Sequence, residues 1–263
     1  MDSMRFEGRE LGLPAEPVEA GELKDGRVYY CVSFVDKAML IPRLHPFVFV
    51  GRNLDIGDKD CLYFQDVESH RQGLRYRTGR GEDDNGDAVF ERRHEKATVD
   101  LFEYERALDV LMVCALRRRE ASKGGVIAGR DHPSEASSLR MFYEAREIKP
   151  YAEHVNADRL EEGAVYFSCM FLDDGETGSP VLEPLVFIGR NLLPEDVHGI
   201  ETTVYFQDAH SYLRGARHDS SLPGVPMPRI EGASEGDATW FFEYERALDQ
   251  LIGHWLQRHR QTR

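Results

Sequence analysis

The sequence predicts an α+β protein built from two related units, and three observations lead to this prediction. The octapeptide FEYERALD occurs at 102–109 and again at 242–249. Blocks of similar sequence precede both copies in the same order, such as PFVFVGRNL at 46–54 and PLVFIGRNL at 184–192. Each copy also opens a segment with helical periodicity, after segments with the composition of β-strands. Repetition of this kind indicates a repeated structural unit.

These blocks divide the chain into two units and a connecting segment. The chain has 263 residues, which is enough for two ordinary domains. We expect tandem homologous units at 4–120 and 141–260. The segment 121–140 contains several Gly and Ser residues and no periodic apolar pattern, so it is predicted to be a linker. Like units most often associate with twofold symmetry, so the units are expected to pack about a pseudo-twofold axis.

Each unit is expected to begin with an antiparallel β-meander of three to four strands. Apolar runs rich in aromatic and β-branched residues predict the first strand, at 28–35 and 165–172. The second is predicted at PFVFVG and PLVFIG, each opened by a proline, which suits the start of a strand. The third is predicted at 61–66 and 203–208. A fourth is predicted near 88–92 in the first unit; its counterpart region is too rich in proline for a strand to be assigned there.

One long helix is expected to close each unit and to cover its sheet. Apolar residues recur at spacings of three and four from the octapeptide onward, which is the pattern of an amphipathic helix. Burial of such a stripe stabilises the fold by about 1.5–3 kcal/mol for each large side chain. The stripe contains Leu101, Tyr104, Leu108, Leu111 and Ala115 in the first unit, and Phe241, Tyr244, Leu248, Leu251 and Trp255 in the second.

The composition argues against several classes of protein. The net charge is −14 at pH 7, which disfavours nucleic acid and suits a basic protein partner. No segment has the roughly 20 apolar residues needed to span a bilayer, and the first residues do not resemble a signal peptide. The four cysteines form no CxxC motif, so we expect a cytoplasmic protein. No metal-binding, phosphate-binding or dinucleotide-binding motif is present, so neither a metal nor a cofactor is predicted.

Charged residues inside the octapeptide are the first candidates for a specific role. Four carboxylates lie off the apolar stripes: Glu105, Asp109, Glu245 and Asp249. A solvated surface alone does not require identical residues in both copies. We therefore expect structural ion pairs, with Arg52 and Arg190 as the arginines that could provide bidentate partners. A solvated helix surface and contact with a ligand are the alternatives.

Polar residues at the ends of the second and third strands are the candidate binding residues. In the GRN motifs, glycine indicates a β-bulge and asparagine tolerates a left-handed backbone. In the QD dipeptides, the aspartate suits either a cap for the following turn or an acid–base dyad with His70 or His210. The candidate binding residues are Arg52, Asn53, Gln65, Asp66, Arg190, Asn191, Gln207 and Asp208.

These observations favour a non-catalytic cytoplasmic protein that binds a ligand or another protein, with a regulatory or immunity-like role towards a basic partner. No nucleophile, base and orienting group converge in the sequence. The alternative is a hydrolase-type enzyme with an Asp/His site at strand ends between the two units. A third hypothesis is an assembly component whose edge strands pair between chains. A monomer that contains an internal pseudo-dimer is expected rather than a large oligomer.

Overall fold

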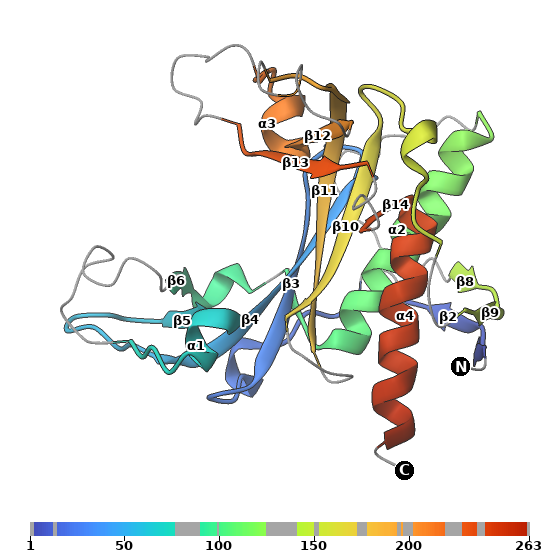
Figure 1. Ribbon diagram of the computed structural model, residues 1–263. Helices are drawn as coiled ribbons and strands as arrows, with labels where there is room; N and C mark the ends of the chain where they lie inside the picture. Colours follow the sequence, from blue (N-terminus) through green and yellow to red (C-terminus); the bar gives the residue numbers. More distant parts are fainter. Residues whose placement is uncertain are drawn as a thin grey trace.

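The protein is an α+β structure with two long helices and a curled antiparallel sheet that forms a half-barrel (Figure 1). The computed structural model describes residues 3–12, 15–76, 90–98, 100–124, 141–149, 153–172, 178–193, 196, 202–218, 228–235 and 240–261. The helices, α2 (Tyr104–Ser122) and α4 (Tyr244–Gln261), lie side by side against one face of the sheet. We call residues 3–124 the first half and residues 141–261 the second half.

The strands of the first half pair in sequence order. β3 (Val28–Phe34), β4 (Pro42–Arg52), β5 (Cys61–Asp66) and β6 (Phe90–His94) form consecutive antiparallel pairs. The short strand β7 (Leu101–Phe102) pairs with the other edge of β3, and the helix α1 (Val67–Arg71) follows β5. The four strands predicted for this half are confirmed, although β4 begins earlier than the sequence pattern indicates.

The second half contains a similar succession of elements: β10 (Val165–Leu172), β11 (Ser179–Arg190), β12 (Thr203–Asp208), α3 (Ala209–Leu213), β13 (Ile230–Ser234) and β14 (Phe241–Phe242). The sequence analysis assigns no fourth strand to this half, but β13 pairs with β12 along its whole length. The prolines that argued against a strand all precede Ile230. They end before the ladder begins and therefore remove none of its hydrogen bonds.

Strand pairing joins the two halves. Leu44 of β4 pairs with Leu182 of β11, so ten strands of the described residues form one sheet. The N-terminal strands β1 (Met4–Phe6) and β2 (Arg9–Leu11) pair with β9 (Arg146–Ile148) and β8 (Met141–Tyr143), respectively. The sequence pattern predicts none of these four strands, because three residues are too few to show periodicity. The predicted linker begins inside α2, and its residues 125–140 lie outside the described residues.

The main core lies between the helices and the sheet. It contains most of both predicted helical stripes together with Leu44 and Leu182 from the centre of the sheet. The stripe prediction is wrong for Leu101 and Phe241, which lie in β7 and β14 and pack in two other apolar clusters. The hydroxyl of Tyr104 donates to the backbone carbonyl of Leu251, 2.8 Å away in the other helix. The hydroxyl of Tyr244 donates to the carbonyl of Leu111 at 2.7 Å. These buried hydrogen bonds fix α2 against α4. None of the described helices is long and apolar enough to cross a membrane.

The GRN motifs form the bulges that their sequence predicts. The register of β4 with β5 shifts between Phe49 and Gly51, and that of β11 with β12 shifts at Gly189. Asn53 and Asn191 have φ values of 49° and 50°, in the left-handed region where asparagine is tolerated. These motifs are therefore turn-forming elements in both halves.

Candidate functional site

Arg52 and Arg190 stabilise backbone next to their bulges. Arg52 forms an ion pair with Glu95 at 2.9 Å and donates to the carbonyl of Ala20. Arg190 donates to the carbonyl of Ala157 at 2.5 Å. The expected pairing of these arginines with the octapeptide is therefore wrong. The Arg52 guanidinium lies over the Phe49 ring, which belongs to an apolar cluster on the side of the sheet away from the helices.

The octapeptide carboxylates form ion pairs with arginines of the short N-terminal strands. Arg9 binds Asp109 and, at 2.9 Å, Glu105. In the second half, Arg146 lies 3.1 Å from Glu245 and 2.7 Å from Asp249. Burial raises the pKa of Asp109 and of Asp249, while the nearby arginines oppose this shift. The structural ion pairs are thus present with other partners. The equivalent places of Arg9 and Arg146 in the matching sequence blocks were the signal for them.

The QD dipeptides hold the short helices in place. The Ser69 backbone N–H donates to Asp66 at 2.8 Å, so Asp66 is the N-cap of α1. The Gln65 side chain is fully buried and donates to the Ser69 hydroxyl at 2.9 Å and to the Leu74 carbonyl at 3.1 Å. Asp208 and Gln207 make the same contacts with Ser211 and Ala216. These four candidate binding residues therefore have structural contacts.

Other groups with possible reactivity are also held in structural environments. Burial raises the pKa of Cys31, Cys114 and Cys169 to about 12, so these thiols stay protonated and are poor nucleophiles at neutral pH. The His210 ring contacts Arg214 at 3.3 Å. Within the described residues, no group of three His, Cys, Asp or Glu side chains could hold a metal ion.

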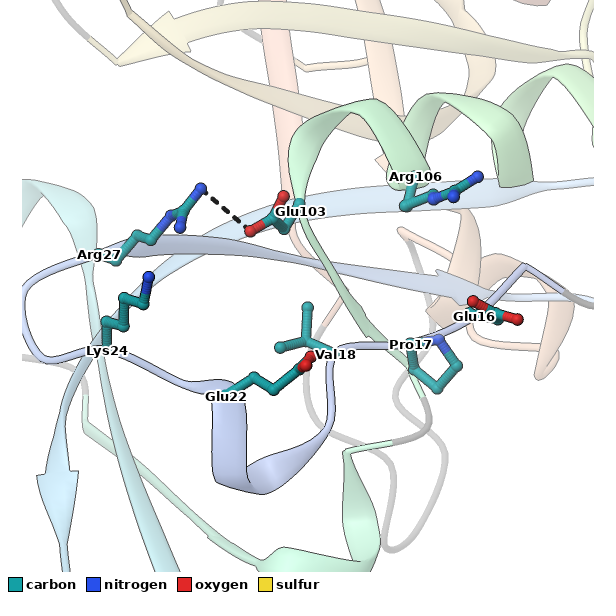
Figure 2. A pocket seen from close by; sticks show the side chains of 8 residues that line it. All are labelled: Glu16, Pro17, Val18, Glu22, Lys24, Arg27, Glu103 and Arg106. Carbon is teal, nitrogen blue, oxygen red and sulfur yellow. Dashed lines mark ion pairs between the residues drawn. The ribbon is translucent and has the colours of Figure 1, made fainter.

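A pocket with charged walls is the candidate functional site of the first half (Figure 2). Its volume is about 450 Å³. We call it the charged pocket, and the residues that line it are Glu16, Pro17, Val18, Glu22, Lys24, Arg27, Glu103 and Arg106. Most of them come from the segment between β2 and β3, and the last two come from the start of α2. None of the lining residues is among the candidate binding residues predicted from the sequence.

The wall of the charged pocket is held by backbone hydrogen bonds. The Val18 N–H donates to the carbonyl of Leu101 at 2.8 Å, and the Lys24 N–H donates to the hydroxyl of Tyr29 at 2.9 Å. The Arg52 guanidinium binds the carbonyl of Ala20, at the start of the 3₁₀ turn η1 (Ala20–Glu22) that carries Glu22. A site with a fixed wall loses little conformational entropy when a ligand binds.

Some charges of the pocket have partners within the described part of the chain, and others do not. Arg27 forms an ion pair with Glu103 at 3.0 Å, and Arg106 forms one with Asp109 at 3.3 Å. Among the contacts of the described residues, the side chains of Glu16, Glu22 and Lys24 have no hydrogen bond or ion pair. The pocket therefore presents two carboxylates and one ammonium group to a ligand.

The matching wall of the second half carries different charges. Lys24 and Glu161 occupy equivalent places, because the backbone N–H of each donates to a tyrosine hydroxyl five residues ahead. In the same alignment, Glu22 corresponds to Arg159 and Arg27 to Ala164. The charge arrangement of the pocket is thus particular to the first half. No protein-family model, curated protein or solved structure matches the chain.

Proposed function

We propose that this protein is a non-catalytic binding protein, made by tandem duplication of one α+β unit, that binds a basic protein partner at the charged pocket. The observation that carries the proposal is a contrast, within the described residues, between polar residues that bond within the fold and polar residues of the pocket that do not. Residues present in both halves, such as Arg52 and Asp66, bond within the fold. The pocket carboxylate Glu22, where the second half has Arg159, makes no such bond among the contacts of the described residues. Glu16 also has no partner among them, although the second half keeps a glutamate, Glu153, in its place.

Paired contacts support the duplication and a pseudo-twofold axis between the units 4–120 and 141–260. Tyr104 bonds the carbonyl of Leu251 while Tyr244 bonds that of Leu111, so each octapeptide tyrosine reaches the equivalent leucine of the other helix. The exchange of short strands is also reciprocal. Leu44 and Leu182 occupy equivalent places in the two sequence blocks and pair with each other. A contact between equivalent residues is expected on a twofold axis.

Charge supports a basic protein partner rather than nucleic acid. The net charge of −14 attracts a cationic surface over distances near the Debye length and speeds its association. A phosphate backbone would be repelled by the same field. We further propose that the protein acts as a cytoplasmic monomer, because the two units already satisfy each other's apolar surfaces.

The alternative is a hydrolase that uses Asp66 with His70 or Asp208 with His210 at the strand ends. The capping hydrogen bonds of both aspartates favour the binding function instead, because an N-cap carboxylate already has a structural contact. A screen of the purified protein against ester, amide and phosphoester substrates tests the alternative, and activity lost in Asp66→Asn or Asp208→Asn would support it.

Affinity capture with matched variants tests the binding function. The wild-type protein, the pocket variant Glu16→Lys/Glu22→Lys and the control variant Glu161→Lys/Glu162→Lys are immobilised and exposed to native lysate at low and at high salt. Both variants change the net charge equally, and all four positions are exposed. We expect a basic protein that the wild type and the control retain at low salt and that the pocket variant loses. The proposal fails if no captured protein depends on both salt and the pocket.

A further inference from the structure

We infer that the charged pocket recognises a group of the basic amino-acid class, which carries two cationic groups and one carboxylate on a flexible apolar stem. Lysine and arginine are its common members. This inference rests on the proposed binding function and narrows it to the chemistry of the bound group.

The unpaired charges of the pocket define which charges a ligand should carry. Glu16 and Glu22 are carboxylates without an intramolecular partner among the described residues, and Lys24 is an ammonium group in the same condition. The remaining charges are already neutralised, because Arg27 pairs with Glu103 and Arg106 pairs with Asp109. A ligand with two cations and one carboxylate therefore matches the unpaired charges one to one.

The positions of these side chains give the ligand a direction (Figure 2). Lys24 lies at one end of the pocket beside Arg27, and Glu16 lies towards the other end next to Pro17. Glu22 projects from the wall between them. The geometry points to a carboxylate bound near Lys24, with one cationic group near Glu22 and a second near Glu16.

The rest of the wall suits a methylene stem. Pro17 and Val18 are the apolar lining residues, and Val18 is held in place by its hydrogen bond to Leu101. The side chains of lysine and arginine lay their methylene groups along such surfaces while their charged ends stay solvated. The volume of about 450 Å³ falls within the range of small-molecule sites. An anionic ligand such as a phosphate is disfavoured by the two unpaired carboxylates.

Isothermal titration calorimetry with defined probes tests this inference. L-arginine and L-lysine are the full ligands, and each of three analogues lacks one charge: L-citrulline, L-argininamide and Nα-acetyl-L-arginine. Each analogue is expected to bind about tenfold more weakly or worse, as for the loss of one charged hydrogen bond. Peptides with arginine at the C-terminus or at the N-terminus then distinguish a free amino acid from a chain terminus as the source of the group.

Variants locate the binding. Glu22→Gln and Lys24→Gln each remove one proposed contact and are expected to weaken arginine binding by about tenfold. The control is Glu161→Gln, which occupies the place of Lys24 in the second half and should leave binding unchanged. Circular dichroism spectra and melting temperatures equal to those of the wild type establish that each variant is folded.

Three results would overturn the inference: equal binding of arginine and its analogues, unchanged binding in both pocket variants, or no binding of any probe. The proposed function is judged separately by affinity capture. Pocket-dependent capture of a basic protein without amino-acid binding would leave that function standing and remove only the inferred ligand class. Arginine binding without any captured partner would support the inferred ligand class as a small-molecule site and would remove the proposed protein partner.

Discussion

Replacement of Arg146 with Met should destabilise the protein strongly, because it removes the nearest cation from the buried Asp249 of α4 and one of the two arginines that bind Glu245. The Arg146 guanidinium lies 3.1 Å from Glu245 and 2.7 Å from Asp249, whose side chain is only 12% exposed. Removal of one partner from a buried pair typically costs about 3–5 kcal/mol. Glu245 keeps Arg119 at 2.8 Å and Asp249 keeps Arg246 at 3.4 Å, so the lower end, about 3 kcal/mol, is expected.

Urea unfolding and calorimetry measure this effect. A loss of about 3 kcal/mol corresponds to a fall in melting temperature of roughly 6–12 °C for a chain of this size. The deficit should shrink at acidic pH, because protonation neutralises the buried Asp249. The double variant Arg146→Met/Asp249→Leu should recover most of the stability, since it removes both members of the pair.

The control is Arg5→Met, whose ion pair with Glu7 is 70% and 78% exposed. It should leave the melting temperature unchanged, as is common for exposed pairs. If Arg146→Met lowered the stability by less than about 1 kcal/mol, it would behave like a surface pair, and the structural role assigned to the octapeptide carboxylates would be refuted.

Three further predictions concern the core and the bulges. Burial lowers the pKa of His254 from 6.5 to about 4, so as the pH falls the unfolded chain is protonated at this histidine before the folded protein is. The free energy of unfolding should therefore fall by up to roughly 3 kcal/mol between about pH 6.5 and pH 4, and in urea unfolding the variant His254→Leu should lose this part of the pH dependence. Tyr244→Phe deletes the 2.7 Å hydrogen bond to the Leu111 carbonyl and should cost about 1–2 kcal/mol in urea unfolding; an unchanged midpoint would contradict the helix lock. Gly189→Ala should lower the melting temperature, because φ is +141° and a Cβ would meet a leucine carbon at 2.9 Å, whereas Gly12→Ala has open space and should be neutral.

Much of the local structure could be predicted, because it depends on patterns within a few residues. The aromatic and β-branched runs formed β3 and β10, and the GRN motifs formed the bulges where glycine and asparagine adopt positive φ. The parts of the predicted stripes that lie in α2 and α4 pack in the core as expected, whereas Leu101 and Phe241 belong to short strands. Failures occurred where the pattern was short or misleading. The three-residue strands showed no period, and the prolines before β13 suggested a loop although they lie outside the strand.

Partners distant in sequence could not be predicted in the same way. The carboxylates of the octapeptide indicated ion pairs, but their charge is equally compatible with any arginine. Arg9 reaches these carboxylates only because its strand, β2, pairs with β8 and lies beside the start of α2. The charged pocket has the same origin, since it combines the segment before β3 with residues at the start of α2, about eighty positions later.

The amino-acid sequence by itself determined the α+β composition, the order of the three longer strands and the long helix in each half, and the conformations of the bulges. These properties arise from steric preferences and periodicities that act over two to four residues. Only the tertiary structure decided that Arg9 and Arg146 neutralise the octapeptide, that Arg52 supports the turn carrying Glu22, and that the unpaired charges gather in one pocket. The physical reason is that an ion pair or a pocket depends on which backbone segments meet, and side-chain charge alone does not specify that meeting.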